Sequence, residues 1–349
     1  MLLPFGTESS VPSVTALVFS RLAPAEPTPV FETYWRFAAE RQEIFFKRWR
    51  GEAPPWTRDW ILERHKFTNA YRASDRASQF LVRHVIYSGS QDIREVFFRT
   101  ILFKLFNRIE TWHLLEKHLG PLLALEFNVD RYDAVLAAAM EADQRIYSGA
   151  YIMPSASRGQ AKYKHRTHLE LLHRMLGDEL PQRLADSCSM QECFERLRAY
   201  PMMGDFLAYQ YTIDLNYGPV LDFSEMNFVV PGPGARDGIR KCFRSLGGLT
   251  EADIIRLMAD RQESEFERLG IPFKTLWGRQ LQLIDCQNLF CEVDKYARYA
   301  HPEYVGITGR TKIKQMFRPN LTTIEYWYPP KWGLNDRITA GTEIDYAYV

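Results

Sequence analysis

The segment VPGPGARDGI, residues 230–239, is the most specific local signal for the fold in this 349-residue sequence. Its Pro-Gly-x-Gly core, followed by a small and an aliphatic residue at the start of an expected helix, is typical of a helix-hairpin-helix turn. Glycines permit a tight turn and a close approach of the backbone to a ligand. Free N–H groups at the start of the next helix suit one DNA phosphate without reading base sequence. An ordinary Gly-Pro loop before a helix is the alternative interpretation.

Basic residues at this turn and in two other segments are candidates for phosphate contacts. At the turn, the predicted DNA-binding residues are Gly232, Gly234, Arg236 and Lys241, with Arg240 adding charge. Residues 158–174 and 310–318 are locally basic, and in the first segment we single out Arg158, Lys162 and Lys164. Solvated charged surfaces without a ligand are the alternative for both segments.

Helical periodicity dominates the rest of the chain. Apolar residues recur at steps of three and four from Phe31 to Trp49, and Gly51 ends the run. Long β-type alternation is scarce, so the sequence predicts an all-α, mostly helical fold. Further helical runs are expected at residues 57–66, 75–87, 91–118, 129–146, 165–176, 189–199 and 203–214.

Three parts are expected along the chain. Residues 1–30 hold five prolines and few charges, which predicts an irregular N-terminal arm. Residues 31–305 are expected to form a single helical domain, with the helix-hairpin-helix at about 228–246. Residues 306–349 are rich in Pro, Gly, Tyr and Trp, which predicts an extended C-terminal tail lying over the body.

Composition and charge exclude several classes of protein. Hydrophobic residues make up 46% of the sequence and charged residues 25%, which is typical of a globular protein and not of a disordered one. The formal net charge of +1 does not indicate a globally basic nucleic-acid binder, although a local patch is compatible with it. Five cysteines without a CxxC pair indicate neither a disulfide framework nor a zinc site. We predict no metal and no cofactor.

Several motifs and targeting segments are also missing from the sequence. It contains no GxxxxGK[ST] phosphate-binding loop, no HExxH and no GxSxG. Without 18 consecutive apolar residues or a basic leader, neither a membrane span nor a signal peptide is expected. We therefore expect a cytoplasmic protein.

Asp285 is the candidate catalytic acid. It stands at the start of an expected helix, downstream of the predicted hairpin, as the acid does in helix-hairpin-helix DNA glycosylases. Such a carboxylate stabilises an oxocarbenium-like sugar and activates water. Asn288 lies three residues on, on the same helix face, and is the second predicted catalytic residue. A capping aspartate on a solvated face is the alternative, and the rival acids are Asp214, Glu225 and Asp294.

A dense polar cluster at residues 67–79 is the candidate base pocket. Its Asn, Arg, Asp and Gln side chains can hydrogen-bond the edge of an extruded base and hold phosphates. Structural ion pairs around Asp75 are the alternative. Gln42 falls on the apolar stripe of its helix, so it must be hydrogen-bonded in the core or face a pocket. The predicted substrate-binding residues are Gln42, Asn69, Arg72, Asp75, Arg76, Asn107 and Gln287.

The sequence resembles a known family over residues 31–332. The family is the α-glutamyl/putrescinyl-thymine pyrophosphorylase group, clade 2, which shares its helical domain with 5-hydroxymethyluracil DNA kinases. The motifs that carry the resemblance are Glu40-Arg41-Gln42, Pro55-Trp56-Thr57, Phe67-Thr68-Asn69, Tyr71-Arg72, Asp75-Arg76, Phe103 to Thr111, Asp214-Leu215-Asn216-Tyr217, Gly232-Pro233-Gly234-Ala235 and Asp285-Cys286-Gln287-Asn288.

The resemblance implies a DNA-glycosylase-like helical fold that acts on hypermodified pyrimidines in phage DNA. Related members resemble anti-phage glycosylases. The expected function is therefore a glycosylase that flips and excises a hypermodified pyrimidine, such as glucosylated hydroxymethylcytosine, and leaves an abasic site. The expected partner is double-stranded phage DNA with hypermodified bases, bound by a monomer. Lys241 and Lys274 keep a lyase mechanism open.

Two other functions remain open. One is a transferase that displaces pyrophosphate from an activated methyl group on thymine in DNA and leaves the glycosidic bond intact. The other is a non-catalytic reader of modified DNA. Without a phosphate-binding loop in this sequence, the kinase activity of the family is not carried over.

Overall fold

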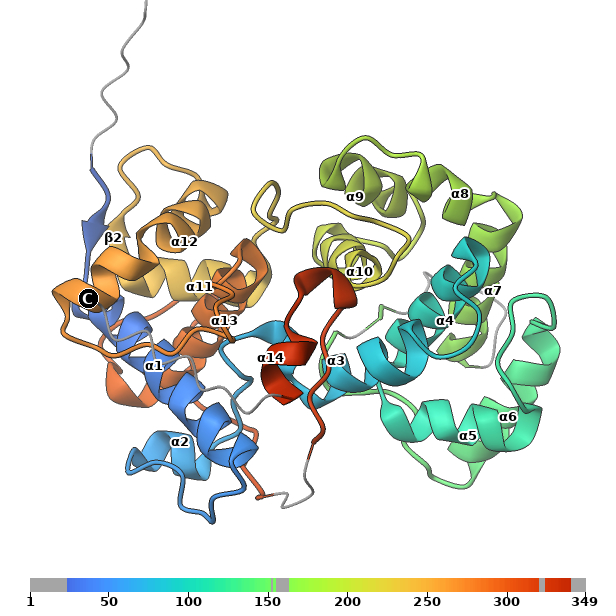
Figure 1. The fold of residues 1–349 in the computed structure, drawn as a ribbon, viewed down its shortest axis with the longest axis horizontal. Coiled ribbons are helices and arrows are strands. Elements are labelled where there is room, and N and C mark those ends of the chain that lie inside the picture. Colours follow the sequence, from blue (N-terminus) through green and yellow to red (C-terminus); the bar gives the residue numbers. More distant parts are fainter. Residues whose placement is uncertain (1–23, 152, 155–162, 320–323, 340–349) are drawn as a thin grey trace, which may run out of the picture.

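The structure is a computed structural model that describes residues 24–151, 153–154, 163–319 and 324–339 (Figure 1). Almost all of its regular structure is helical. Within the described residues the only strands are β1 (Glu26–Pro27) and β2 (Phe243–Ser245), which pair antiparallel. The prediction of a mostly helical single domain is confirmed. Among the described residues, no helix is long and apolar enough to cross a bilayer.

The helices form two lobes that lie side by side (Figure 1). The first lobe combines helices from early and late in the sequence, namely α1 (Pro29–Trp49), α2 (Trp60–Arg64), α11 (Pro233–Cys242), α12 (Glu251–Arg268) and α13 (Leu283–Ala300). The second lobe contains α4 (Ile93–Phe106), α5 (Ile109–Leu119), α6 (Val129–Glu141), α7 (Lys164–Gly177), α8 (Leu180–Ala185), α9 (Met190–Arg198) and α10 (Asp205–Asn216). Between the lobes lie α3 (Arg76–Phe80) and α14 (Asn335–Thr339).

The expected helix at residues 91–118 is two helices, because the chain turns at Asn107. Its φ of 47° is left-handed, a conformation that asparagine tolerates better than most residues. The Asn107 side chain accepts a hydrogen bond from Lys104 Nζ at 2.9 Å, which fixes the turn. The expected helix at residues 129–146 ends at Glu141, two residues before the left-handed Asp143.

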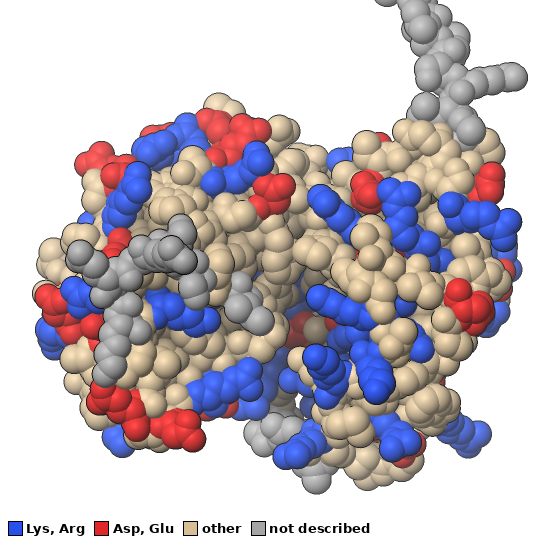
Figure 2. All heavy atoms as spheres, turned by 180° about the vertical axis from the view of Figure 1, so that it is seen from behind, with Lys and Arg blue, Asp and Glu red and all other residues tan. Residues whose placement is uncertain are grey.

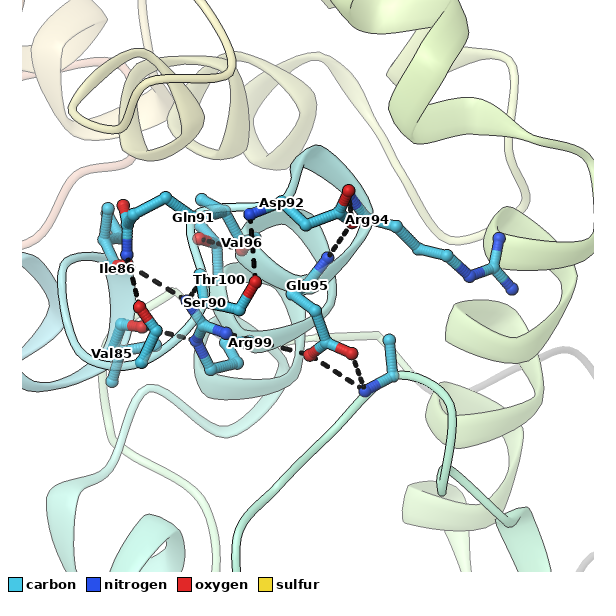
Figure 3. A network of polar contacts seen from close by, with 12 residues as sticks. Val85, Ile86, Ser90, Gln91, Asp92, Arg94, Glu95, Val96, Arg99 and Thr100 are labelled. Carbon is cyan, nitrogen blue, oxygen red and sulfur yellow. Dashed lines mark hydrogen bonds and ion pairs between the residues drawn. The ribbon is translucent and has the colours of Figure 1, made fainter.

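Arg99 holds α4 against the preceding segment (Figure 3). Its guanidinium donates to the carbonyls of Val85 at 2.8 Å, Ile86 at 3.2 Å and Ser90 at 2.6 Å. Val85 and Ile86 end the π-helical segment Leu81–Ile86, so Arg99 binds carbonyls that have no partner inside that helix. Glu95 lies 3.7 Å from Arg99 and accepts the N–H of Ala124.

The segment expected to form the helix-hairpin-helix has a different structure. Residues 228–232 are not helical, and sixteen residues, 217–232, separate the end of α10 from the start of α11. Residues 228–246 therefore contain one helix, α11, followed by β2, and not two helices joined by a short turn. The two prolines at 231 and 233 contribute to this, because each disfavours helix at the residue before it, Val230 and Gly232.

The glycines of this segment serve close helix packing. Gly234 and Gly238 lie one turn apart on the face of α11 that contacts α13. A Cβ at Gly234 would overlap the Cys291 side chain, and one at Gly238 would overlap the carbonyl of Phe290. A Cβ at Gly232 would lie 2.8 Å from the ring of Phe206. The missing side chains thus let α11 and α13 touch through their backbones.

The described part of the predicted tail packs across the two lobes. The Tyr328 hydroxyl is 2.8 Å from Ser74 Oγ, and the N–H of Trp327 donates to Gln79 at 2.8 Å. Lys331 Nζ donates to the carbonyls of Gly218 and Leu221. Residues 330–332 and 335–339 are helical, so this part is not wholly extended.

We predict that Gly238→Ala destabilises the protein by about 2–3 kcal/mol, because the added methyl group meets backbone that cannot rotate away. Chemical denaturation followed by circular dichroism measures the change. Gly177→Ala is the matched control, since that helical glycine has open space around it and should shift stability by less than about 1 kcal/mol. Equal effects of the two substitutions would contradict the packing role.

Candidate active site at the junction of the two lobes

Arg72 connects the two lobes. It begins the short 3-10 helix Arg72–Ser74 and is 1% exposed. Its backbone N–H donates to Asp285 Oδ1 in the first lobe at 2.8 Å. Its guanidinium reaches the second lobe, where it donates to Gln210 at 3.0 Å and the Tyr217 hydroxyl at 3.1 Å and lies 2.8 Å from Asp214. One side chain and its own backbone therefore bind both halves of the molecule.

Asp214 is held by two cations. Its second oxygen lies 3.1 Å from Lys104 Nζ, and all three charged groups are at least 97% buried. Burial alone would raise the pKa of Asp214, but Arg72 and Lys104 together hold it below its usual value. Burial lowers the pKa of Lys104 to about 8, against the opposing effect of Asp214. This cluster, which we call the junction cluster (Arg72, Lys104 and Asp214), carries one more positive than negative formal charge.

Tyr151 covers the junction cluster. Its ring centre is 4.2 Å from Lys104 Nζ and 5.6 Å from the guanidinium carbon of Arg72. The ring also stacks on Phe206 at 5.8 Å. Tyr151 has a φ of 54°, a strained value for an aromatic residue, and such strain concentrates at ligand-binding sites.

Two buried carboxyl groups flank Arg72. Asp285 is 4% exposed, and its two oxygens accept the backbone N–H groups of Arg72 at 2.8 Å and Gln282 at 3.0 Å. Burial, with a smaller contribution from Glu225, raises the pKa of Asp285 to about 7. Burial also raises the pKa of Glu225, which lies 2.9 Å from Arg279. Paired carboxyls with raised pKa values are common at catalytic sites.

Most predicted residues of the Asp285 motif lie at this junction. Gln210 Nε2 donates to Gln287 Oε1 at 3.2 Å, and Gln287 contacts the half-buried Asn288 at 3.4 Å. These residues join Asp285 and Arg72 in one hydrogen-bonded group. Asn107 reaches the same region through Lys104.

The other predicted pocket residues form a neighbouring network that shapes the chain before Arg72. Asn69 donates from its backbone to Asp75 at 2.8 Å and from its side chain to the carbonyl of Ser74. Arg41 donates to Asn69 at 3.2 Å. Burial raises the pKa of Asp75 to about 7. Within the described residues Asp75 forms no ion pair, and Arg72 pairs with Asp214 instead, so the cluster at residues 67–79 is held by hydrogen bonds and not by the ion pairs expected as the alternative.

Gln42 and Arg76 lie apart from this network. Gln42 is 1% exposed, and its amide nitrogen has no hydrogen-bond partner among the described residues. Arg76 is exposed at the start of α3. Neither side chain makes a contact with the junction cluster in the described structure.

Lys241 is not available to DNA, contrary to the prediction. It is 1% exposed, lies 2.9 Å from Asp294 and donates to the Asp294 carbonyl at 3.0 Å. Asp294 also pairs with Arg298, so this rival acid has an internal role. The prediction failed because spacing along α11 does not say which of its faces packs against α13.

The remaining predicted phosphate contacts fall in three groups. Arg236 is exposed on the first turn of α11 and remains a candidate. Lys164 is half-buried, with its ammonium 4.1 Å from the ring of Tyr147. Arg158 and Lys162 lie outside the described residues. Gly232 is buried, and Gly234 faces α13, so any phosphate contact there would involve only their backbone N–H groups.

Lys104, Gln210 and Tyr151 were missed as site residues. Lys104 stands in the run FFRTILFKLF, residues 97–106, which is otherwise almost wholly apolar. The helix is buried on nearly all sides, so a lysine there needs a buried partner. That isolated charge was the available signal. Gln210 and Tyr151 have no comparable pattern around them.

The face of the molecule opposite to that of Figure 1 is hollowed between its two halves (Figure 2). Blue Lys and Arg side chains gather around the hollow, and red carboxylates lie within it. Although the net charge is only +1, one face of the molecule is therefore locally positive. Such a surface attracts the phosphates of DNA.

Fold and site together define a two-lobed helical protein with a buried charged centre between its lobes. A family model described as "5-hmdU DNA kinase, helical domain" matches residues 28–306. The chain belongs to this family, which confirms its resemblance to the helical domain of 5-hydroxymethyluracil DNA kinases.

A curated relative carries the same name. The chain is 28% identical over 344 residues to the 5-hmdU DNA kinase of Bacillus phage SP10. The alignment covers 91% of this chain and 52% of the relative, so the chain spans about half of the relative's length. No solved structure matches the chain.

We predict that the stability of Asp285→Asn relative to the wild type increases as pH rises from about 4 to about 7. The folded wild type holds the Asp285 proton in this range, whereas the unfolded chain releases it near pH 4. The free energy of unfolding of the wild type therefore falls across this window. The difference in this free energy between the variant and the wild type changes by on the order of 4 kcal/mol. Denaturant unfolding at several pH values measures it.

Asp253→Asn is the matched control for this titration. Asp253 occupies the same third position of its helix and accepts the N–H of Thr250 at 2.9 Å, but it is exposed. Hydrogen bonds from Thr250 hold the pKa of Asp253 below its usual value. Its difference from wild type should stay flat between pH 4 and 7. A flat difference for Asp285→Asn as well would show that its carboxyl is not buried as described.

Proposed function

We propose that this protein binds DNA across the hollow between its lobes and acts on a 5-hydroxymethyl-type pyrimidine nucleotide at the junction cluster. The favoured reaction is group transfer at the C5 methylene. The C–O bond to an anionic leaving group such as phosphate or pyrophosphate breaks, and its electron pair stays on the leaving oxygen. An amine or hydroxyl acceptor forms the new bond and loses a proton.

The excess positive charge of the junction cluster carries this proposal. Two buried cations, Arg72 and Lys104, face the single carboxylate of Asp214. A departing phosphate or pyrophosphate develops negative charge, and fixed buried cations stabilise it more strongly than water-exposed ones do. The names of the family and of the phage relative also point to DNA containing 5-hydroxymethyldeoxyuridine.

Excision of the base is the second candidate, supported by the two carboxyls Asp285 and Glu225. The pKa of Asp285, about 7, suits general acid or base catalysis near neutral pH, and burial also raises the pKa of Glu225. In this reaction the N-glycosidic bond breaks with its electron pair on the base, water supplies the hydroxyl group at C1′, and the proton that the water loses ends on the departing base. However, both oxygens of Asp285 already accept backbone N–H groups, which leaves the carboxylate little freedom to move toward a sugar.

One experiment separates the two reactions. Purified protein is incubated with DNA carrying 5-hydroxymethyldeoxyuridine, its phosphate and pyrophosphate esters, glucosylated hydroxymethylcytosine or unmodified bases, with and without amine acceptors. Nucleosides are analysed by mass spectrometry, and abasic sites by an aldehyde probe. Group transfer gives a nucleoside of changed mass with no free base. Free base and abasic sites would replace this proposal with the glycosylase, and no change in any DNA would reject both reactions.

We predict that Lys104→Met lowers the rate of whichever reaction is found by about 100-fold or more, the usual effect of losing one buried charge-stabilising group. Lys241→Met is the matched control, since Lys241 forms the same kind of buried pair with Asp294 outside the junction. Both variants should lose stability, but only the first should lose activity per folded molecule. Equal activity losses would assign Lys104 a structural role alone.

We predict that Arg236→Ala weakens binding to duplex DNA and lowers the slope of log K against log salt by about one. Arg240→Ala is the control on the same helix, because Arg240 lies 2.9 Å from Glu251 and is partly neutralised. Fluorescence anisotropy at several salt concentrations measures both variants. An unchanged slope for Arg236→Ala would remove this residue from the DNA-binding surface.

A further inference from the structure

A cavity of about 400 Å³ opens on the first lobe, away from the junction cluster. It lies between the first half of α1, the start of α2 and the last turns of α13, and its lining includes Arg36, Phe37, Glu40, Arg58, Asp59 and Tyr296. Tyr296 stands eleven residues after Asp285 on α13, which places it about 16 Å further along the helix. The cavity is therefore separate from the site described above.

Arg36 is left without an anion even though its own helix offers two. Glu32 and Glu40 stand four residues before and after it, at the spacing that forms ion pairs on a helix. Glu32 instead lies 3.3 Å from Arg268, and Glu40 accepts the Thr57 hydroxyl at 2.5 Å. Within the described part of the chain, Arg36 has no hydrogen bond or ion pair.

Arg58 also lacks an anionic partner among the described residues. The adjacent carboxylate, Asp59, accepts the N–H groups of Ile61 at 2.8 Å and Leu62 at 3.2 Å and the Tyr296 hydroxyl at 2.5 Å. Asp59 is thus the N-cap of α2. Arg58 has no hydrogen bond or ion pair among the described residues. Two exposed guanidinium groups at one cavity are left with their donors free.

The rest of the cavity wall suits a ligand that has an aromatic ring and a few polar groups. Phe37 and Tyr296 meet edge to face, with ring centres 5.4 Å apart, and the half-buried Tyr296 offers most of the aromatic surface, since Phe37 is 3% exposed. Glu40 uses only one carboxylate oxygen for Thr57, so the other can accept a hydroxyl or amino group. The volume lies within the range of small-molecule sites.

We propose that this cavity binds a mononucleotide. Arg36 and Arg58 hold its phosphate, for which the guanidinium fork is well shaped. The base lies against Phe37 and Tyr296, and a sugar hydroxyl or base amino group donates to Glu40. The nucleotide is either free in solution or a nucleotide at an accessible end of DNA. The site stands on its own geometry and does not depend on the proposed reaction.

Direct binding measurements test this site without an activity readout. Calorimetric titration of the full chain with AMP, dTMP, adenosine and inorganic phosphate is compared with titration by a short unmodified duplex. AMP or dTMP should bind more tightly than adenosine or phosphate alone, because both halves of the ligand are recognised. Binding of the duplex alone would identify a nucleotide of DNA as the source.

Variants at the cavity decide whether the bound ligand occupies it. Arg36→Ala with Arg58→Ala should raise the dissociation constant at least tenfold, and exposed arginines without partners can be removed without unfolding the chain. Arg64→Ala is the matched control, since Arg64 is an exposed arginine on α2 that does not line the cavity. No binding by any probe, or equal binding by the double variant and the control, would overturn the proposal.

Discussion

The contact on which the structure depends most is the one that Arg72 makes with both lobes. Its N–H group binds Asp285 at the start of α13, and its guanidinium binds Asp214 on α10. Removing one partner of such a buried pair leaves an unpaired charge and typically destabilises a protein by about 3–5 kcal/mol. An apolar replacement of the whole cluster would often be equally stable. Stability alone therefore does not explain why three charged groups lie in this junction, which is one reason why we propose a chemical role for them.

The sequence predicted more of the residues on the first-lobe side of this junction than of those on the second-lobe side. Arg72, Asp285, Gln287 and Asn288 lie at or near the starts of helical segments. Polar residues stand out there, because the neighbouring sequence indicates a helix start. Lys104 and Gln210 belong to α4 and α10, which are buried on nearly all sides. A helix without a solvent face gives no contrast between apolar and polar positions, so periodicity cannot indicate which polar residue is functional.

The Pro-Gly-x-Gly segment shows a second limit of sequence reasoning. A glycine marks a place where something approaches the backbone closely, but the sequence does not say what approaches. At Gly234 and Gly238 the approaching group is α13 and not a phosphate. The motif still matters for the site, because this packing fixes the helix whose first turn carries Asp285. The motif therefore acts on the junction by positioning α13, and we propose direct DNA contact only for exposed neighbours such as Arg236.

The balance of charge at neutral pH distinguishes the two reactions that we consider for the junction. Base excision develops positive charge on the sugar, so it needs an ionised carboxylate nearby. Asp285, with a pKa of about 7, is only partly ionised there, and its oxygens are occupied by N–H groups. Lys104, with a pKa of about 8, is mostly charged, and Arg72 is fully charged. Asp214 neutralises one of these two charges. The charge left over is positive, and it complements a leaving group that departs as an anion.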